Sequence, residues 1–236
     1  MGEYNHESET VHSCVDCGVT NCNKMDRFYP EFCLTTDMDE RLLGEVIRLY
    51  DDEENKKVTV AAAGVESDYY CQMCRVEETI EFAKRIGAKK IGIATCVGLI
   101  RETRKLTDIL RYHGFEVYGV ACKAGIVRKT EVGIPKTCEN TGVNMCNPIL
   151  QAKILNAEHT DLNIVMGLCV GHDSLFYKYS EALTPLLQPS ELLRSKYASA
   201  LFRSNRISVF FPCDILKFSL ILSAVDFFRF IRISVS

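Results

Sequence analysis

The stretch NIVMGLCVGHDS, residues 163–174, decides how the fold of this chain is interpreted. It begins as a short apolar run of the kind that is buried on both faces of a parallel sheet. It ends at Cys169, Gly171 and His172, where the backbone has to turn into the next segment. A buried strand followed by such a turn is typical of α/β proteins.

Two earlier stretches repeat this pattern. Residues 91–98 run apolar to Cys96, and residues 117–125 run apolar to Cys122. Each of these strands therefore ends in a cysteine that is followed within a few residues by glycine. Because ligands bind at the carboxyl ends of the strands in open parallel sheets, the sequence predicts a sulfur-rich edge there.

Segments with apolar residues at helical spacing separate these strands. The sequence predicts strands over 57–63, 90–96, 116–121 and from 163, and helices over 37–54, 76–87, 99–114 and 148–157. Alternation of strands and helices favours crossover connections between parallel strands. We therefore expect an α/β fold, with a mostly parallel open sheet flanked by helices.

Composition narrows the classes of function. The net charge is -3 and no long Lys/Arg run occurs, which argues against a nucleic-acid partner. No apolar run reaches the roughly 20 residues of a membrane span. The N-terminal residues carry neither an apolar signal core nor a basic leader, so we expect a cytoplasmic protein. In that reducing compartment, 12 cysteines favour metal ligation or redox chemistry over structural disulfides.

Four cysteines lie close together near the N-terminus, with the spacing C-x2-C-x4-C-x10-C. They are Cys14, Cys17, Cys22 and Cys33. The surrounding segment has few aliphatic residues, so burial of apolar surface alone cannot order it. Four thiolates around one metal centre would do so, and both zinc and an iron–sulfur cluster suit four sulfur ligands. We therefore predict a cysteine-rich metal-binding lobe over residues 1–36.

A further pair, Cys71 and Cys74, is placed at the start of the helix predicted over residues 76–87. A thiol at a helix N-terminus has its thiolate stabilised by the backbone dipole. Dithiol chemistry and a metal-ligand role are both compatible with this pair.

The cysteines at the predicted sheet edge form a second group, Cys96, Cys122, Cys146 and Cys169. Cys146 directly precedes Asn147 and Pro148, which are typical residues for a helix start, and its pKa should fall there. The four are expected to act either as a second, cofactor-binding ligand set or as reactive thiols. Residues 123–146 lack a sustained period and are of a length typical of a lid or binding loop, or of a disordered segment.

An enzyme with a single cysteine nucleophile is the alternative to a metal-binding or redox protein. Cys169 or Cys146 would attack a small-molecule substrate, with His172 as base and Asp173 orienting the imidazole. A metal-sensing or metal-delivery module without turnover is a third hypothesis. These hypotheses imply a metal ion and a small-molecule or redox partner as binding partners. The sequence does not decide whether the protein is an enzyme or what its oligomeric state is.

The character of the sequence changes after Leu183. All 14 glycines lie before residue 172, whereas seven of the 12 phenylalanines follow Leu201. The last residues are mostly apolar and are interrupted by single charges. They show neither the spacing of an amphipathic helix nor the alternation of a strand, and no turn residues separate possible elements. We therefore divide the chain into the lobe 1–36, an α/β domain over 37–184 and a tail over 185–236. Our hypothesis for the tail is that the natural reading frame is lost near Leu183.

The stretch from about Ser13 to Ala182 resembles an uncharacterised prokaryotic family of unknown function whose members are described as metal-binding proteins. The resemblance rests on the four-cysteine start and on RVEETIEFAKRIGAKKIGIATCVGL, GFEVYGVACKAG and CNPILQAKILNAEHTDLNIVMGLCVGHDSLFYKYS, in that order. It implies that Cys14, Cys17, Cys22 and Cys33 are metal ligands. The cysteines of the sheet edge, with His172 and Asp173, occupy motif positions of the family without an assigned role. After Ala182 the family continues with a valine-rich strand, where this chain has LTPLLQPSELLRSKY.

Overall fold

The computed structural model describes residues 11–187 of the chain. The chain divides into two compact units, Met1–Val60 and Ala61–Ser236, which are described separately below. Residues 188–236 of the predicted tail lie outside the described residues, and the hypothesis that the reading frame is lost near Leu183 stays a prediction.

The first unit contains a short 3-10 helix, a helix and the beginning of a second helix. They are η1 (Cys14–Asp16), α1 (Glu40–Leu49) and the start of α2 (Glu53–Tyr69). The carboxylate of Asp39 caps α1 by accepting hydrogen bonds from the backbone N–H groups of Arg41 (2.9 Å) and Leu42 (3.3 Å). The helix predicted over residues 37–54 is therefore shorter than expected.

The strand predicted over Lys57–Ala63 is wrong, because these residues belong to α2. The alternation of Val58 and Val60 has the period of a strand, but only Ala61 and Val65 of this helix are buried, four residues apart as on one helix face. The helix also has a strong start, since Asp52 accepts hydrogen bonds from the backbone N–H groups of residues 54 (3.0 Å) and 55 (3.1 Å).

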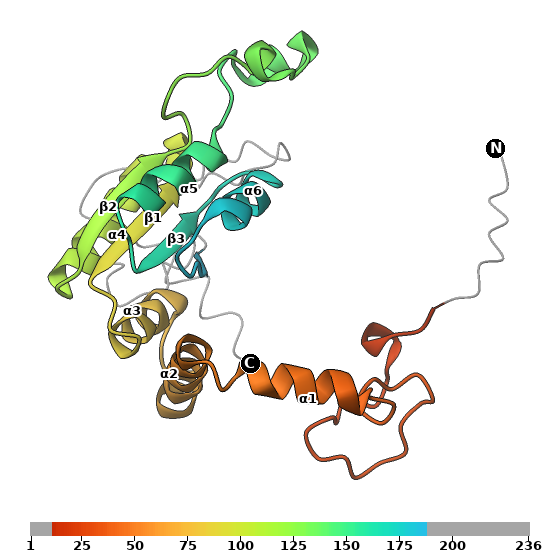
Figure 1. Ribbon diagram of the computed structural model, residues 1–236. Coiled ribbons are helices and arrows are strands. Elements are labelled where there is room, and N and C mark those ends of the chain that lie inside the picture. Colours follow the sequence, from red (N-terminus) through yellow and green to blue (C-terminus); the bar gives the residue numbers. More distant parts are fainter. Residues whose placement is uncertain (1–10, 188–236) are drawn as a thin grey trace, which may run out of the picture. The chain divides into compact units, whose positions relative to one another are not determined.

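The second unit is built around a sheet of four parallel strands in the order β2-β1-β3-β4 (Figure 1). The strands are β1 (Lys90–Thr95), β2 (Glu116–Ala121), β3 (Leu162–Met166) and β4 (Leu186–Leu187). The helices are α3 (Arg75–Arg85), α4 (Ile100–Tyr112), α5 (Pro148–Ala157) and α6 (His172–Tyr179), with 3-10 turns η2 (Val97–Leu99), η3 (Lys129–Val132) and η4 (Lys136–Thr141). The predicted α/β fold with a parallel sheet flanked by helices is thereby confirmed.

Helices cover both faces of the sheet (Figure 1). On one face, apolar residues of α3 and α4 pack against side chains such as Ile91, Ile93 and Ile164. On the other face, α5 and α6 pack against Ala94, Val120 and Val165. The helix that follows β1 thus lies on the opposite face from those that follow β2 and β3. Connections that diverge in this way mark the place where α/β sheets bind ligands, at the carboxyl ends of the strands.

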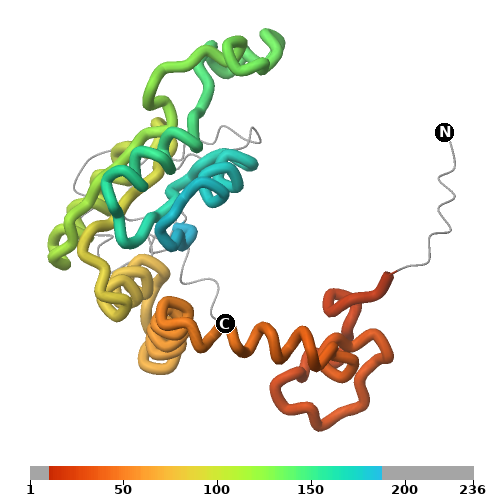
Figure 2. Tube along the Cα trace, in the orientation of Figure 1, coloured from red at the N-terminus to blue at the C-terminus, as the bar shows by residue number. Residues whose placement is uncertain are grey.

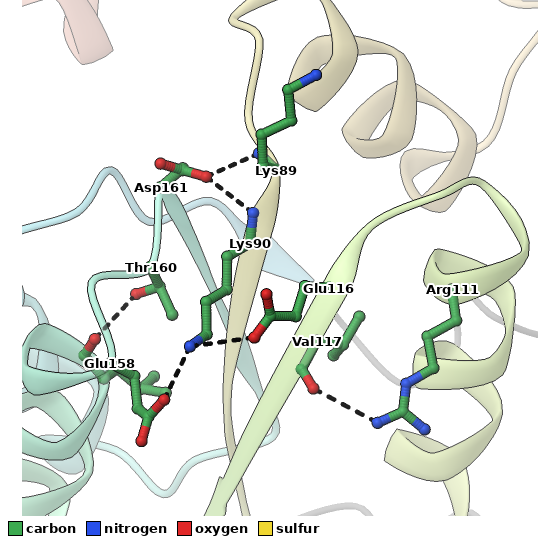
Figure 3. A network of polar contacts seen from close by, with 9 residues as sticks. Lys89, Lys90, Arg111, Glu116, Val117, Glu158, Thr160 and Asp161 are labelled. Atoms are coloured by element: carbon green, nitrogen blue, oxygen red, sulfur yellow. Dashed lines mark hydrogen bonds and ion pairs between the residues drawn. The ribbon is translucent and has the colours of Figure 1, made fainter.

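The opposite, amino ends of the strands are held by charged groups (Figure 3). The carboxylate of Asp161 accepts hydrogen bonds from the backbone N–H groups of Lys89 (2.7 Å) and Lys90 (2.8 Å). The Nζ of Lys90 forms ion pairs with Glu158 (2.8 Å) and Glu116 (3.2 Å). These contacts align three neighbouring strands at the end away from the predicted sulfur-rich edge.

Residues 123–146 leave the body of the second unit and return to it as an ordered arm (Figures 1 and 2). The two limbs of the arm meet in an antiparallel bridge between Arg128 and Asn144, and hydrogen bonds join the backbones on either side of it. The tip consists of η3 and η4 and carries the exposed Cys138. The segment is therefore a hairpin-like extension.

None of the helices that the structure describes between residues 11 and 187 has both the length and the apolar character needed to cross a membrane.

A substitution at Gly92 tests the packing of the sheet against α5. A Cβ built on Gly92 would collide with Oδ1 of Asn163 and lie 2.9 Å from a methyl group of Leu155. The Asn163 oxygen accepts a hydrogen bond from the hydroxyl of Thr160 at 2.8 Å, so it cannot move without loss. We expect Gly92→Ala to lower the free energy of unfolding by about 1–3 kcal/mol.

Gly119→Ala is the matched control, because a Cβ at this strand glycine meets only the backbone oxygen of Ile93 at 4.0 Å. We expect its unfolding midpoint to stay close to that of the wild type in urea titrations followed by far-ultraviolet circular dichroism. Equal stability of the two variants would contradict the packing described for β1 and α5.

Candidate functional site

The carboxyl ends of β1 and β2 bring two of the predicted cysteines together. Thr95 pairs with Ala121, so Cys96 and Cys122 each lie one residue beyond the same level of the sheet. The backbone N–H of Cys122 donates to the carbonyl of Thr95 at 2.8 Å, which continues the ladder to this point. Cys96 packs against the apolar cluster that contains Cys122, and the interaction of the two thiols lowers the pKa of Cys96 and raises the pKa of Cys122.

Cys122 is the central residue of the cluster. Its side chain is only 2% exposed, and Cys96 and Cys146 both pack against the apolar cluster to which it belongs. Its sulfur also accepts a hydrogen bond from the backbone N–H of Val97 at 3.3 Å. The contacts with Cys146 and then with Cys96, together with burial, raise the pKa of Cys122, so this residue stays protonated between its two neighbours.

Cys146 reaches the cluster because the chain returns from the arm into α5. The backbone N–H of Asn147 donates to the carbonyl of Cys122 at 2.7 Å, and the Asn147 side chain caps α5 by accepting from the N–H of Leu150 at 3.1 Å. The Cys146 sulfur interacts with the Cys122 thiol, with His172 and with the ammonium group of Lys123. In that order, these groups lower the pKa of Cys146 to about 4.

His172 is the first residue of α6 and follows Gly171, whose φ of 80° places the backbone in the left-handed region. The hydrogen bond with Cys146 raises the pKa of His172, and the charge of Asp173 acts in the same direction. An imidazolium and a thiolate therefore stabilise each other at this position. The Asp173 carboxylate itself accepts a hydrogen bond from the N–H of Ser174 at 2.8 Å.

Cys96 is the third thiol of the cluster and is half-buried. Its pKa is lowered to about 6, first by the Cys122 thiol and then by the backbone N–H of Gly98, against the effect of burial. The Cys122 thiol has one proton and can donate it to only one neighbour at a time. The charge of Lys123 acts on both Cys96 and Cys146, but only Cys146 also interacts with His172, so Cys146 is the principal thiolate of the site.

Cys169 contributes to the site through its backbone. Its carbonyl accepts hydrogen bonds from the N–H groups of His172 (2.9 Å) and Asp173 (3.4 Å), and this turn presents His172 to Cys146. The predicted roles of its half-buried thiol, as nucleophile or ligand, stay predictions.

Two residues of the site were not anticipated from the sequence. Lys123 follows Cys122 and anchors its Nζ on the carbonyl of Asn144 at 2.7 Å, beside Cys146. Gln151 is fully buried, and its side-chain N–H group donates to the carbonyls of Thr95 (3.1 Å) and Val120 (2.7 Å). The sequence offered a signal for each of these residues. Lys123 is a cation that directly follows a cysteine, and Gln151 is an amide on an otherwise apolar helix face.

The pair Cys71 and Cys74 differs from the expectation of a lowered pKa. Cys74 caps α3 but packs against the apolar core, and burial raises the pKa of its thiol despite the nearby backbone N–H groups. Cys71 is exposed and has a φ of 57°. Burial therefore outweighs the helix terminus at this position.

The four N-terminal cysteines occupy different environments. Cys14 and Cys22 are exposed, Cys17 is half-buried and Cys33 is buried. The backbone N–H and hydroxyl of Thr36 and the backbone N–H of Thr35 lower the pKa of Cys33. Over residues 11–187, no three His, Cys, Asp or Glu side chains are arranged so that they could hold a metal ion. The donor chemistry of the four cysteines fits zinc or an iron–sulfur cluster, and the predicted ligand set stays a prediction.

Comparison with known protein families gives a match that covers every cysteine of the sheet-edge cluster. A protein family described as "Protein of unknown function (DUF1847)" matches residues 33–187, which include Cys33 and every residue of the sheet-edge site. "Uncharacterized protein MJ0455" of Methanocaldococcus jannaschii is 42% identical over 185 residues, which cover 78% of this chain and 92% of that protein. No solved structure matches the chain. The extent of the family match shows that this chain belongs to the DUF1847 family.

Proposed function

We propose that this protein carries out thiol chemistry at the carboxyl edge of its parallel sheet, with Cys146 as the reactive thiolate. One observation carries the proposal: the Cys146 sulfur is held by the Cys122 thiol, by His172 and by Lys123 at the same time. A thiolate that is half-exposed and has cationic neighbours is the form of cysteine that attacks electrophiles.

Thiol–disulfide exchange with a small-molecule or redox partner is the reaction class that this arrangement favours. A disulfide substrate requires an attacking thiolate and a second thiol that completes the exchange. Cys146 packs against the apolar cluster that contains Cys122 and interacts with its thiol, so a second thiol is close to the reactive one. A reducing cytoplasm would keep these cysteines in the thiol form between reactions.

A cysteine-nucleophile enzyme is the second candidate, and the contact between Cys146 and His172 favours it. The thiolate forms without substrate here, so the imidazolium would act chiefly as a proton donor to a leaving group. Asp173 would support the charge of the imidazolium. Such an enzyme needs no second thiol in its covalent steps, whereas thiol–disulfide exchange depends on one.

The predicted metal centre at Cys14, Cys17, Cys22 and Cys33 is a separate proposal, as are the alternatives of a metal-sensing or metal-delivery module. Its support is the spacing of the four thiols and the lowered pKa of Cys33. Metal binding would order this segment and supply the stability that its few apolar residues do not. The thiol chemistry of the sheet edge uses no residue of this segment.

The pH dependence of alkylation tests the role of Cys146. Because the Cys146 pKa is about 4, its thiolate is present at neutral pH and is lost only as the pH falls through that value. We expect its rate with iodoacetamide to be nearly constant from about pH 6 to about pH 8, whereas the rate of an ordinary thiol rises about tenfold per pH unit. Peptide mass spectrometry measures the rate at each cysteine.

Replacement of His172 tests the cause of the lowered pKa. His172→Gln removes the imidazole beside the Cys146 sulfur, so in a profile extended down to about pH 3 the midpoint for Cys146 should move upward by about one pH unit or more. Cys138→Ser, at an exposed position on the tip of the arm, should leave the Cys146 profile unchanged. A Cys146 rate that rises about tenfold per pH unit between about pH 6 and about pH 8 in the wild type would contradict the proposal.

Metal analysis after anaerobic purification tests the N-terminal proposal. We expect zinc, or iron with a sulfide-type visible spectrum, in about one centre per chain. The double variant Cys14→Ser/Cys17→Ser should lose this metal, because two of four ligands are gone. Cys138→Ser should retain it. Metal that persists in the double variant, or that disappears instead in Cys146→Ser, would place the metal elsewhere.

A further inference from the structure

Cys96 and Cys146 both pack against the apolar cluster that contains Cys122, and both thiols interact with the Cys122 thiol. Cys96 and Cys146 are half-buried, whereas Cys122 is 2% exposed. A molecule from solution therefore meets Cys146 or Cys96 first, and Cys122 is reached from within the protein.

The backbone geometry suits a disulfide on either side of Cys122. Cys96 and Cys122 continue the register of two adjacent parallel strands, which lie about 4.8 Å apart. That separation is within the Cα range of about 4.4–6.8 Å seen in disulfides. On the other side, the hydrogen bond from the Asn147 N–H to the Cys122 carbonyl brings the backbones at Cys122 and Cys146 together.

We propose that Cys146, Cys122 and Cys96 form a disulfide relay that reduces small-molecule disulfides and moves the resulting protein disulfide away from Cys146. The proposal rests on the thiol function proposed above and assigns Cys122 as the resolving residue. Cys96 becomes the residue that stores the oxidation.

The first step is attack of the Cys146 thiolate on one sulfur of the substrate disulfide. The substrate S–S bond breaks, a mixed disulfide with Cys146 forms, and the leaving thiolate takes the proton of the His172 imidazolium. Cys122 then attacks the Cys146 sulfur, the mixed disulfide breaks, and the proton of Cys122 goes to the second product thiol. One substrate disulfide has become two thiols, and two protein thiols have become the Cys122–Cys146 disulfide.

The next step transfers the disulfide within the protein. The sulfur of Cys96 attacks Cys122, the Cys122–Cys146 bond breaks, and Cys146 leaves as a thiolate while the proton of Cys96 ends on His172. Cys146 is the better leaving group because it regains its contacts with His172 and Lys123. The site is again ready to attack, and the Cys96–Cys122 disulfide awaits reduction by an external thiol.

Trapping experiments with oxidised glutathione as the probe test the relay in the full-length reduced protein. After quenching with acid and N-ethylmaleimide, peptide mass spectrometry identifies each linkage. We expect the wild type to accumulate the Cys96–Cys122 disulfide and Cys96→Ser to accumulate the Cys122–Cys146 disulfide. We expect Cys122→Ser to retain glutathione on Cys146 at least about tenfold longer than the wild type, because an internal thiol at high effective concentration is missing.

Cys138→Ser is the matched control and should behave as the wild type does. If glutathione never attaches to Cys146 in Cys122→Ser, the thiol function itself fails. If it attaches there but the wild type forms no Cys96–Cys122 linkage, the relay alone is overturned. The Cys96→Ser protein retains the buried Cys122, so its linkage tests the assignment of the resolving thiol independently of how well Cys122→Ser folds.

Discussion

The alignment of the parallel strands is the constraint on which the site depends. Thr95 of the central strand pairs with Ala121 on one side and with Met166 on the other, so three strands end at the same level. Because the ladder continues past the last strand residues, the two cysteines that follow β1 and β2 have no freedom to separate. Gln151 strengthens this edge by binding carbonyls of both strands from the side of α5. The buried amide of Gln151 thus joins neighbouring strands at their carboxyl ends, and the network of Lys90 and its carboxylates joins them at their amino ends.

Charge balance then determines which sulfur reacts. A buried thiolate is costly unless cations or hydrogen-bond donors surround it. The charge of Lys123 lowers the pKa of both Cys96 and Cys146, but only Cys146 also interacts with the imidazole of His172. The difference between the two thiols follows from position, because Cys146 lies between the base of the arm, which supplies Lys123, and the start of α6, which supplies His172. Without these two basic groups, the three thiols would behave as small apolar residues of the core.

The sequence was sufficient for much of the second unit because its strands are apolar runs bounded by glycine. The strand predicted over 116–121 has the observed bounds, and the predicted apolar face of the crossover helix that precedes it is buried. It failed at Lys57–Ala63, where valines at alternate positions resembled a strand and burial at helical spacing was not visible. At the site, the strand-end cysteines could be placed at one edge, but the approach of Lys123 to Cys146 could not. That contact joins the two ends of a long excursion, and local sequence patterns contain no information on how such an excursion closes. The raised pKa of Cys74 was missed for a related reason, since burial is a property of tertiary packing.

The arm between Cys122 and Cys146 is a long insertion that nevertheless leaves these two residues close together. A long insertion between two reactive residues could pull them apart, yet its entropic cost grows only slowly with length once its ends are held together. Here the ends are held by the hydrogen bond from Asn147 to Cys122 and by Lys123, which binds the carbonyl of Asn144. Lys123 therefore closes the base of the arm and stabilises the Cys146 thiolate with the same ammonium group. Movement at the tip, around Cys138, leaves the cluster intact as long as this base stays closed, whereas opening of the base would remove a cation from the thiolate.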